Sequence, residues 1–138
     1  MTERGATAVE FAVSLPVILL LVIGTVDFTM WTSASHRLAR SLHDGARVGT
    51  ATLTDDPASD PQPILDATEA AVLDSAELAG FDRDRVTVTA EWKVDDEDVS
   101  WVRVMGRVPY EPLVPYGTPF QRDVVKEFTF IPKEQPHL

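Results

Sequence analysis

The stretch RGATAVEFAVSLPVILLLVIGTVDF, residues 4–28, places one carboxylate, Glu10, at the start of a long apolar run. No charged residue occurs between Glu10 and Asp27. A membrane-spanning helix needs about 20 mostly apolar residues, and Val9–Trp31 supplies them with both acids near the two ends. Aromatic residues such as Trp31 are typical of the membrane–water interface. The stretch therefore predicts a transmembrane helix, and it raises the question of what neutralises Glu10.

Two other interpretations of this run fit less well. A cleaved secretory signal could be cut near Thr32-Ser33-Ala34, but its apolar core would span only about 7–15 residues. A core helix of a soluble protein would carry a polar face, and the segment PVILLLVIG has none. A transmembrane helix remains the better prediction.

Composition constrains the part of the chain beyond the apolar run. A chain of 138 residues holds at most one ordinary domain, and it has no cysteine, which excludes disulfides and thiolate metal sites. The net charge of −10 comes entirely from residues 51–138, which carry 18 acidic and 8 basic side chains. Such a body repels phosphate backbones, so nucleic acid is not an expected partner.

The same stretch resembles the N-terminus of the TadE-like minor pilins or pseudopilins of the tight-adherence (Flp) pilus system. A basic residue, a glycine, a small residue, a glutamate with an aromatic after it, and an apolar run with Leu15-Pro16 carry the resemblance. It implies that a prepilin peptidase cuts between Gly5 and Ala6, which makes Glu10 the fifth mature residue. It also implies that Glu10, Phe11 and Pro16 take part in subunit assembly.

The resemblance further implies partners and a location. Its partners would be membrane lipid, other pilin or pseudopilin subunits, the pilus assembly machinery and a prepilin peptidase. The protein would cross the bacterial cell membrane once, with an extracytoplasmic C-terminal domain. A simple count of basic residues favours the opposite orientation, because Arg4 precedes the span while Arg37, Arg40 and Arg47 follow it.

Cleavage after Gly5 would answer the question raised by Glu10. It would free the α-amino group of Ala6, which is largely cationic at neutral pH and lies about one helical turn from Glu10. A carboxylate–ammonium pair, within one chain or between neighbours, would offset two desolvation penalties and set the register between subunits. The alternative is that Glu10 is solvated among the headgroups. Asp27, near the far interface, could pair with a partner subunit, but solvation is the favoured interpretation.

The remaining sequence predicts an α+β fold with a long first helix, a second helix and a three-stranded antiparallel sheet. The expected parts are a leader (1–5), a transmembrane and amphipathic helix (6–50), a linker (51–63) and a small α+β domain (64–138). In the first helix an apolar stripe is expected to face the domain; it comprises Leu38, Leu42, Ala46 and Gly49. Gly45 is an expected weak point of this helix.

The expected elements of the domain have distinct patterns. The second helix begins with Asp60 as its cap, ends at Gly80 and buries Leu65, Val72, Ala76 and Ala79, and Phe81 folds back onto its last turn. Three alternating segments predict strands at 86–92, 100–110 and 123–131. Their inward residues are expected to be Val86, Val88, Ala90 and Trp92, then Val102, Val104 and Val108, then Val124, Phe128 and Phe130.

No catalytic, metal or cofactor site is predicted. Asp95-Asp96-Glu97-Asp98 lacks the glycine and terminal glutamate of a calcium loop and is expected to form a solvated turn. His36 and His43 are seven residues apart, so they do not form a zinc-binding pair on one helix turn. Ser41, His43 and Asp44 are neighbours on a helix and point apart, so they cannot form a catalytic triad. An exported hydrolase therefore lacks a nucleophile and a base. A pilin-like assembly subunit is favoured over a membrane-tethered binding domain.

Overall fold

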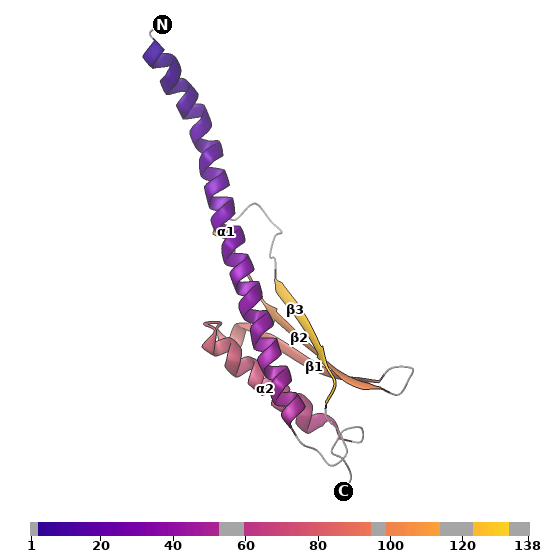
Figure 1. Cartoon of the computed structure of the whole chain (residues 1–138). Helices are drawn as coiled ribbons and strands as arrows, with labels where there is room; N and C mark the ends of the chain where they lie inside the picture. The colour runs from indigo at the N-terminus through magenta and orange to yellow at the C-terminus, as the bar shows by residue number, and fades with distance from the viewer. Residues whose placement is uncertain (1–2, 53–59, 95–98, 114–122, 133–138) are drawn as a thin grey trace.

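The computed structural model describes residues 3–52, 60–94, 99–113 and 123–132. The elements are α1 (Glu3–Ala51), α2 (Gln62–Leu78), the short helix η1 (Arg83–Arg85), β1 (Thr87–Val94), β2 (Ser100–Val108) and β3 (Val124–Phe130). The three strands form one antiparallel sheet in the order β1-β2-β3. Both helices pack on the same face of this sheet, and α1 extends far beyond it (Figure 1). The predicted α+β architecture is confirmed.

The long helix α1 has two halves with different surroundings. We call residues 9–26 the stem; its side chains are exposed or half-exposed, and it projects away from the sheet and α2 (Figure 1). From Ala34 onward one face of α1 is buried against the domain. The predicted stripe is confirmed, since Leu38, Leu42, Ala46 and Gly49 are all buried.

Two joined hydrophobic clusters fill the space between the helices and the sheet. The cluster farther from the stem combines Leu42 and Ala46 of α1, Ile64 and Val72 of α2, and Val102, Val104 and Phe130 of the sheet. The cluster nearer the stem combines Ala34, Leu38, Ala76, Val86, Val108 and Val124. Each cluster takes side chains from α1, α2 and the sheet region, so the domain half of α1 is part of the core.

Glycines allow α1 to approach its neighbours closely. A Cβ atom at Gly45 would lie 2.2 Å from Cγ2 of Val72, and one at Gly49 would lie 2.2 Å from Oγ1 of Thr68. Gly106 of β2 similarly faces Leu42, 3.0 Å from where its Cβ would be. The expectation that Gly45 weakens α1 is wrong: the helix continues through it, and the missing side chain makes room for α2.

The second helix differs from its prediction at its start and on its buried face. Pro61 is the N-cap, with no side-chain hydrogen bond, so Asp60 does not cap α2. The buried residues are Ile64, Thr68, Val72 and Ala76, whereas Leu65 and Ala79 are only half-buried. The buried face of α2 is rotated from the predicted one because its residues recur at every fourth position. Thr68 can be buried there because its hydroxyl donates a hydrogen bond to the Ile64 carbonyl at 2.7 Å.

The predicted end of α2 is confirmed. Gly80 has φ of +87°, which favours glycine, and its N–H donates to the carbonyl of Glu77 at 2.9 Å. The N–H of Phe81 donates back to the carbonyl of Ala76 at 3.0 Å, which completes a Schellman motif. Phe81 then packs against the cluster nearer the stem, as predicted.

The sheet follows its predicted pattern, with strand ends shifted by one or two residues. In β2 the inward residues Val102, Val104 and Val108 are buried, and in β3 the inward row runs from Val124 through Lys126 to Phe130. Lys126, half-buried, keeps the alternation despite its charge. The predicted acidic turn lies outside the described residues.

Candidate functional site

The stem is the most exposed apolar surface in the part of the chain that the structure describes. Its most apolar 18-residue window has a mean hydropathy of 2.4 and none of it is buried inside the molecule. Val13, Val17 and Leu21 are each more than half exposed, with fractions of 69%, 58% and 67%. At 1.5 Å per residue these 18 residues span about 27 Å, close to the hydrocarbon thickness of a bilayer. The stem is one helix that could span a membrane, which fits a membrane-anchored protein.

Polar groups within the stem are satisfied by the helix itself. The hydroxyl of Ser14 donates to the carbonyl of Glu10 at 2.9 Å, and that of Thr25 donates to the carbonyl of Leu21 at 2.8 Å. Pro16 lies inside α1 without ending it. Proline and hydroxyl side chains of this kind are tolerated in transmembrane helices because backbone and hydroxyl groups find local partners.

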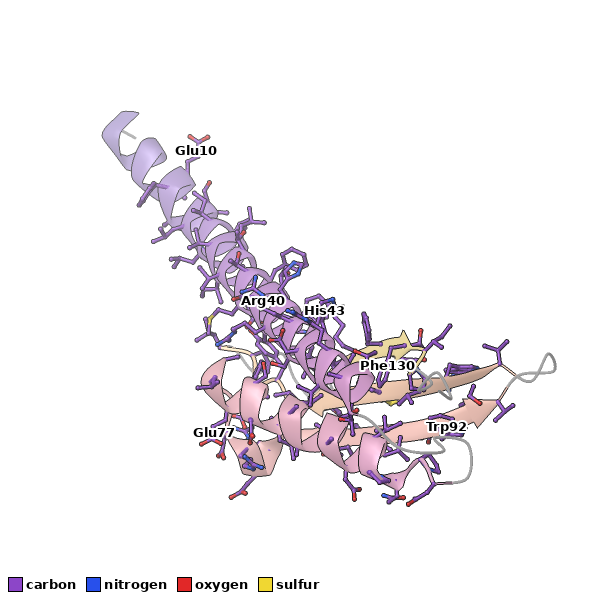
Figure 2. All side chains as sticks on the ribbon, turned by 60° about the horizontal axis from the view of Figure 1, so that its bottom comes forward. Glu10, Arg40, His43, Glu77, Trp92 and Phe130 are labelled. Carbon is purple, nitrogen blue, oxygen red and sulfur yellow. The ribbon has the colours of Figure 1, made fainter. Side chains whose placement is uncertain are left out.

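Glu10 is the exception, because no described residue reaches its carboxylate with a hydrogen bond or an ion pair. The side chain is exposed and points away from the helix axis at the far end of the stem (Figure 2). Phe11 beside it is 61% exposed, and Pro16 is exposed as well. Gly5 and Ala6 lie in the first turns of α1. These predicted site residues all belong to one helix and do not converge.

The other acid of the run, Asp27, is held by the folded domain. The hydroxyl of Tyr110 donates to Asp27 Oδ1 at 2.7 Å and also lies 3.0 Å from the Asp27 carbonyl. The backbone N–H of Leu113 donates to the same Oδ1 at 3.2 Å. The interpretation of Asp27 as simply solvated is therefore wrong. The chain segment after β2 binds α1 at the point where the stem ends.

A second contact fixes α1 to the end of α2 just above this point. Arg37 Nη1 donates to the carbonyl of Ala79 at 3.0 Å, and its guanidinium lies 5.0 Å from the centre of the Phe81 ring. Nearby, Arg85 pairs with Glu111 at 2.6 Å. Trp31, predicted at the interface, is half-buried against the cluster nearer the stem. The stem is therefore joined to the domain by a continuous helix and by several contacts on either side of it.

The Asp27 contact changes the ionisation of Tyr110. Burial of the Tyr110 hydroxyl, together with its hydrogen bond to Asp27, raises the pKa of this group to about 12. Because the pKa of Tyr110 in the folded state lies above the ordinary value of 10.0, the protonated hydroxyl stabilises the folded domain, and this contribution is complete below pH 10. It is lost as the pH rises toward about 12.

We expect Asp27→Asn to lower the pKa of Tyr110 from about 12 toward 10.0, because the hydroxyl loses a charged acceptor. Phenolate absorbance during an alkaline titration of the detergent-solubilised chain measures this shift. The chain has 2 tyrosines, so Tyr110→Phe identifies the relevant step. An unchanged titration in the Asn variant would mean that the Asp27 contact does not form.

The remaining candidate groups do not converge. Ser41 is buried and donates to the Arg37 carbonyl, His43 packs edge-on against Phe128, and Asp44 accepts a hydrogen bond from Ser75. Within the described residues, no group of three or more His, Asp or Glu side chains could hold a metal ion.

Two features of this site have no signal in the sequence. The Tyr110–Asp27 contact joins residues 83 positions apart, and neither residue belongs to a recognisable motif. The close approach at Gly45 also depends on where α2 lies. Glu10, in contrast, stands out in the sequence because a single acid interrupts the start of an apolar run.

Comparison with known families gives one finding. The family model described as TadE-like protein matches residues 5–47, which cover the stem and most of the domain half of α1. No curated protein and no solved structure matches the chain. The TadE-like family is a structural family associated with Tad pilus systems and is not known to be enzymatic. The match therefore supports a pilus-related role. The match confirms the predicted resemblance to the TadE-like family over residues 5–47.

Proposed function

We propose that this chain is a membrane-anchored pilin-like subunit that takes part in assembly of a tight-adherence (Flp-type) pilus. The observation that carries the proposal is the exposed apolar stem with Glu10 at its free end. A simple anchor needs length and apolarity but has no use for a carboxylate near its end. A subunit that docks beside others can use that carboxylate to define register, as polar residues do in packed helices.

The contacts at the other end of the stem support the same role. Asp27, Arg37 and the buried stripe of α1 make the stem and the domain one continuous body. Lateral movement or extraction of the stem would therefore move the domain with it. A tethered binding domain would work equally well on a flexible connection, so the rigid junction favours an assembly subunit.

In this proposal the acidic domain lies outside the cytoplasm. The leader, residues 1–5, stays on the cytoplasmic side and is removed between Gly5 and Ala6. The three arginines that weigh against this orientation in a simple count belong to a folded domain: Arg37 is bonded to Ala79, and Arg40 and Arg47 lie on the same helix. Large domains can be translocated largely regardless of such charges.

Deleting the gene tests the proposed function. We expect cells of the source organism without this chain to lose most surface pili, and the intact gene to restore them. Electron microscopy of pili per cell measures the effect. Unchanged pilus number and length in the deletion strain would instead favour the tethered binding domain.

A further inference from the structure

A row of basic side chains, two arginines and two histidines, lies on the exposed side of α1, opposite its buried face. We call His36, Arg40, His43 and Arg47 the basic stripe; all four are exposed, and their spacing of four, three and four residues keeps them on one helix face. Figure 2 shows Arg40 and His43 on the side of α1 away from α2. Within the described residues, neither Arg40 nor Arg47 has an acidic partner, in a chain of net charge −10.

The outer face of α2 has the opposite charge. We call Asp66, Asp74 and Glu77 the acidic stripe; all three are exposed and lie opposite the buried row of α2, with Ala70 between them. Arg83 pairs with Asp74 at 2.7 Å and with Glu77 at 3.3 Å, so the three carboxylates outnumber this one guanidinium and the face stays negative. Leu78 beside them is 91% exposed.

The two stripes match in height above the membrane. Within one chain, α2 runs antiparallel to α1, with Thr68 beside Gly49, Val72 beside Gly45 and the end of α2 beside Arg37. By this register Glu77 is level with Arg40 and Asp74 with His43, whereas Asp66 is level with residue 51, about 6 Å beyond Arg47 along the helix. Two copies anchored by identical stems stand at the same height, so their stripes would meet in register.

The position of the basic stripe favours a protein partner over lipid. If the hydrocarbon ends at Asp27, His36 lies about 14 Å above it and Arg47 about 30 Å above it, at 1.5 Å per residue. The headgroup layer extends only about 5 to 8 Å on each side of the hydrocarbon. A row of basic side chains that runs away from the bilayer suits an acidic surface standing parallel to α1.

An open groove at the lower end of the basic stripe offers room for an apolar side chain. Phe28, Thr29, Thr32, Ser33, His36, Arg37 and Arg40 line it. In a neighbouring copy, Leu78 stands at the level of Arg37, at the upper part of this groove. A contact between α1 of one copy and α2 of the next would therefore combine charge pairing with burial of one exposed leucine.

We propose that the basic stripe of one copy binds the acidic stripe of a second copy of this chain. The inference rests on the proposed function, because it assumes that both copies stand side by side in one membrane. The stripes lie on opposite sides of the helix pair, so the contact joins unlike faces and can repeat from copy to copy. Screening by salt would weaken it, since both stripes are solvent-exposed.

Cross-linking of the full-length chain in its membrane tests this contact. The chain has no cysteine, so Arg47→Cys and Asp66→Cys can be introduced into two differently tagged copies that are expressed together. A short bis-maleimide should yield a dimer containing both tags. The control pair combines Arg47→Cys with Lys93→Cys, a position on β1, and should give only a background yield of dimer. Each cysteine variant expressed alone should give no more dimer than this control pair.

Charge reversal separates specific pairing from crowding. Arg40→Glu in the Arg47→Cys copy should lower the dimer yield about fivefold, and Glu77→Arg in the Asp66→Cys copy should restore it. Equal yield in the control pair, dimers between identical positions, cross-links to another protein instead of a second copy, or no effect of the charge swap would overturn the inference. Since pilus loss on gene deletion is scored separately, the contact can fail while the proposed function stands.

Discussion

Replacing Gly45 with Val will lower the free energy of unfolding of the domain by about 3 kcal/mol, the upper end of the usual cost of overpacking. The new Cβ would lie 2.2 Å from Val72 Cγ2 and 3.0 Å from the Thr68 backbone carbonyl. The side chain can turn, but the backbone of α2 cannot move without opening both clusters. Denaturant unfolding of the chain in mild detergent, followed by tryptophan fluorescence, measures the loss.

Gly24→Val is the matched control, because the same substitution is made in the same helix. A Cβ at Gly24 has nothing within 4 Å, so the domain should keep its stability. Equal stability of the two variants would mean that α2 does not pack on α1 at Gly45, and the described packing of the two helices would be wrong.

Replacing Glu10 with Gln will leave membrane insertion intact and reduce incorporation into assembled pili at least about tenfold. Removing one partner of a buried charge pair costs about 3 to 5 kcal/mol, because the remaining amine is left uncompensated in hydrocarbon. Insertion depends on the apolar length of the stem, which the substitution does not change. Quantitative immunoblots of the membrane and sheared-pilus fractions measure the two outcomes.

Ser14→Ala provides the control for this variant one turn farther along the stem. Among the residues that the structure describes, its hydroxyl bonds the Glu10 backbone carbonyl alone, so its loss should not affect assembly. If the Gln variant enters pili as well as the Ser14 variant, Glu10 is solvated among the headgroups and sets no register.

Much of the architecture could be predicted because the deciding signals are local. The apolar stem, the stripe through Leu38 and Leu42, the Gly80 helix end and the alternation in β2 all depend on neighbours within a few residues. Family resemblance through the first 28 residues added a role that periodicity alone does not provide.

The predictions that the structure contradicts concern residues where distant parts of the chain meet. Asp27 looked like a solvated boundary residue because Tyr110 lies 83 positions away. Gly45 looked like a weak point because glycine disfavours isolated helices, whereas here α2 occupies the space of its missing side chain. The predicted face of α2 is wrong because Ile64 and Thr68, rather than Leu65 and Ala79, are buried.

The mature N-terminus of the chain in assembled pili is the most direct measurement of the central proposal, that proteolysis creates the cation which Glu10 neutralises. Intact-mass analysis of the chain from purified pili, supported by N-terminal sequencing, reports it. We predict a polypeptide that begins at Ala6. A chain that retains Met1 and still assembles normally would contradict the account.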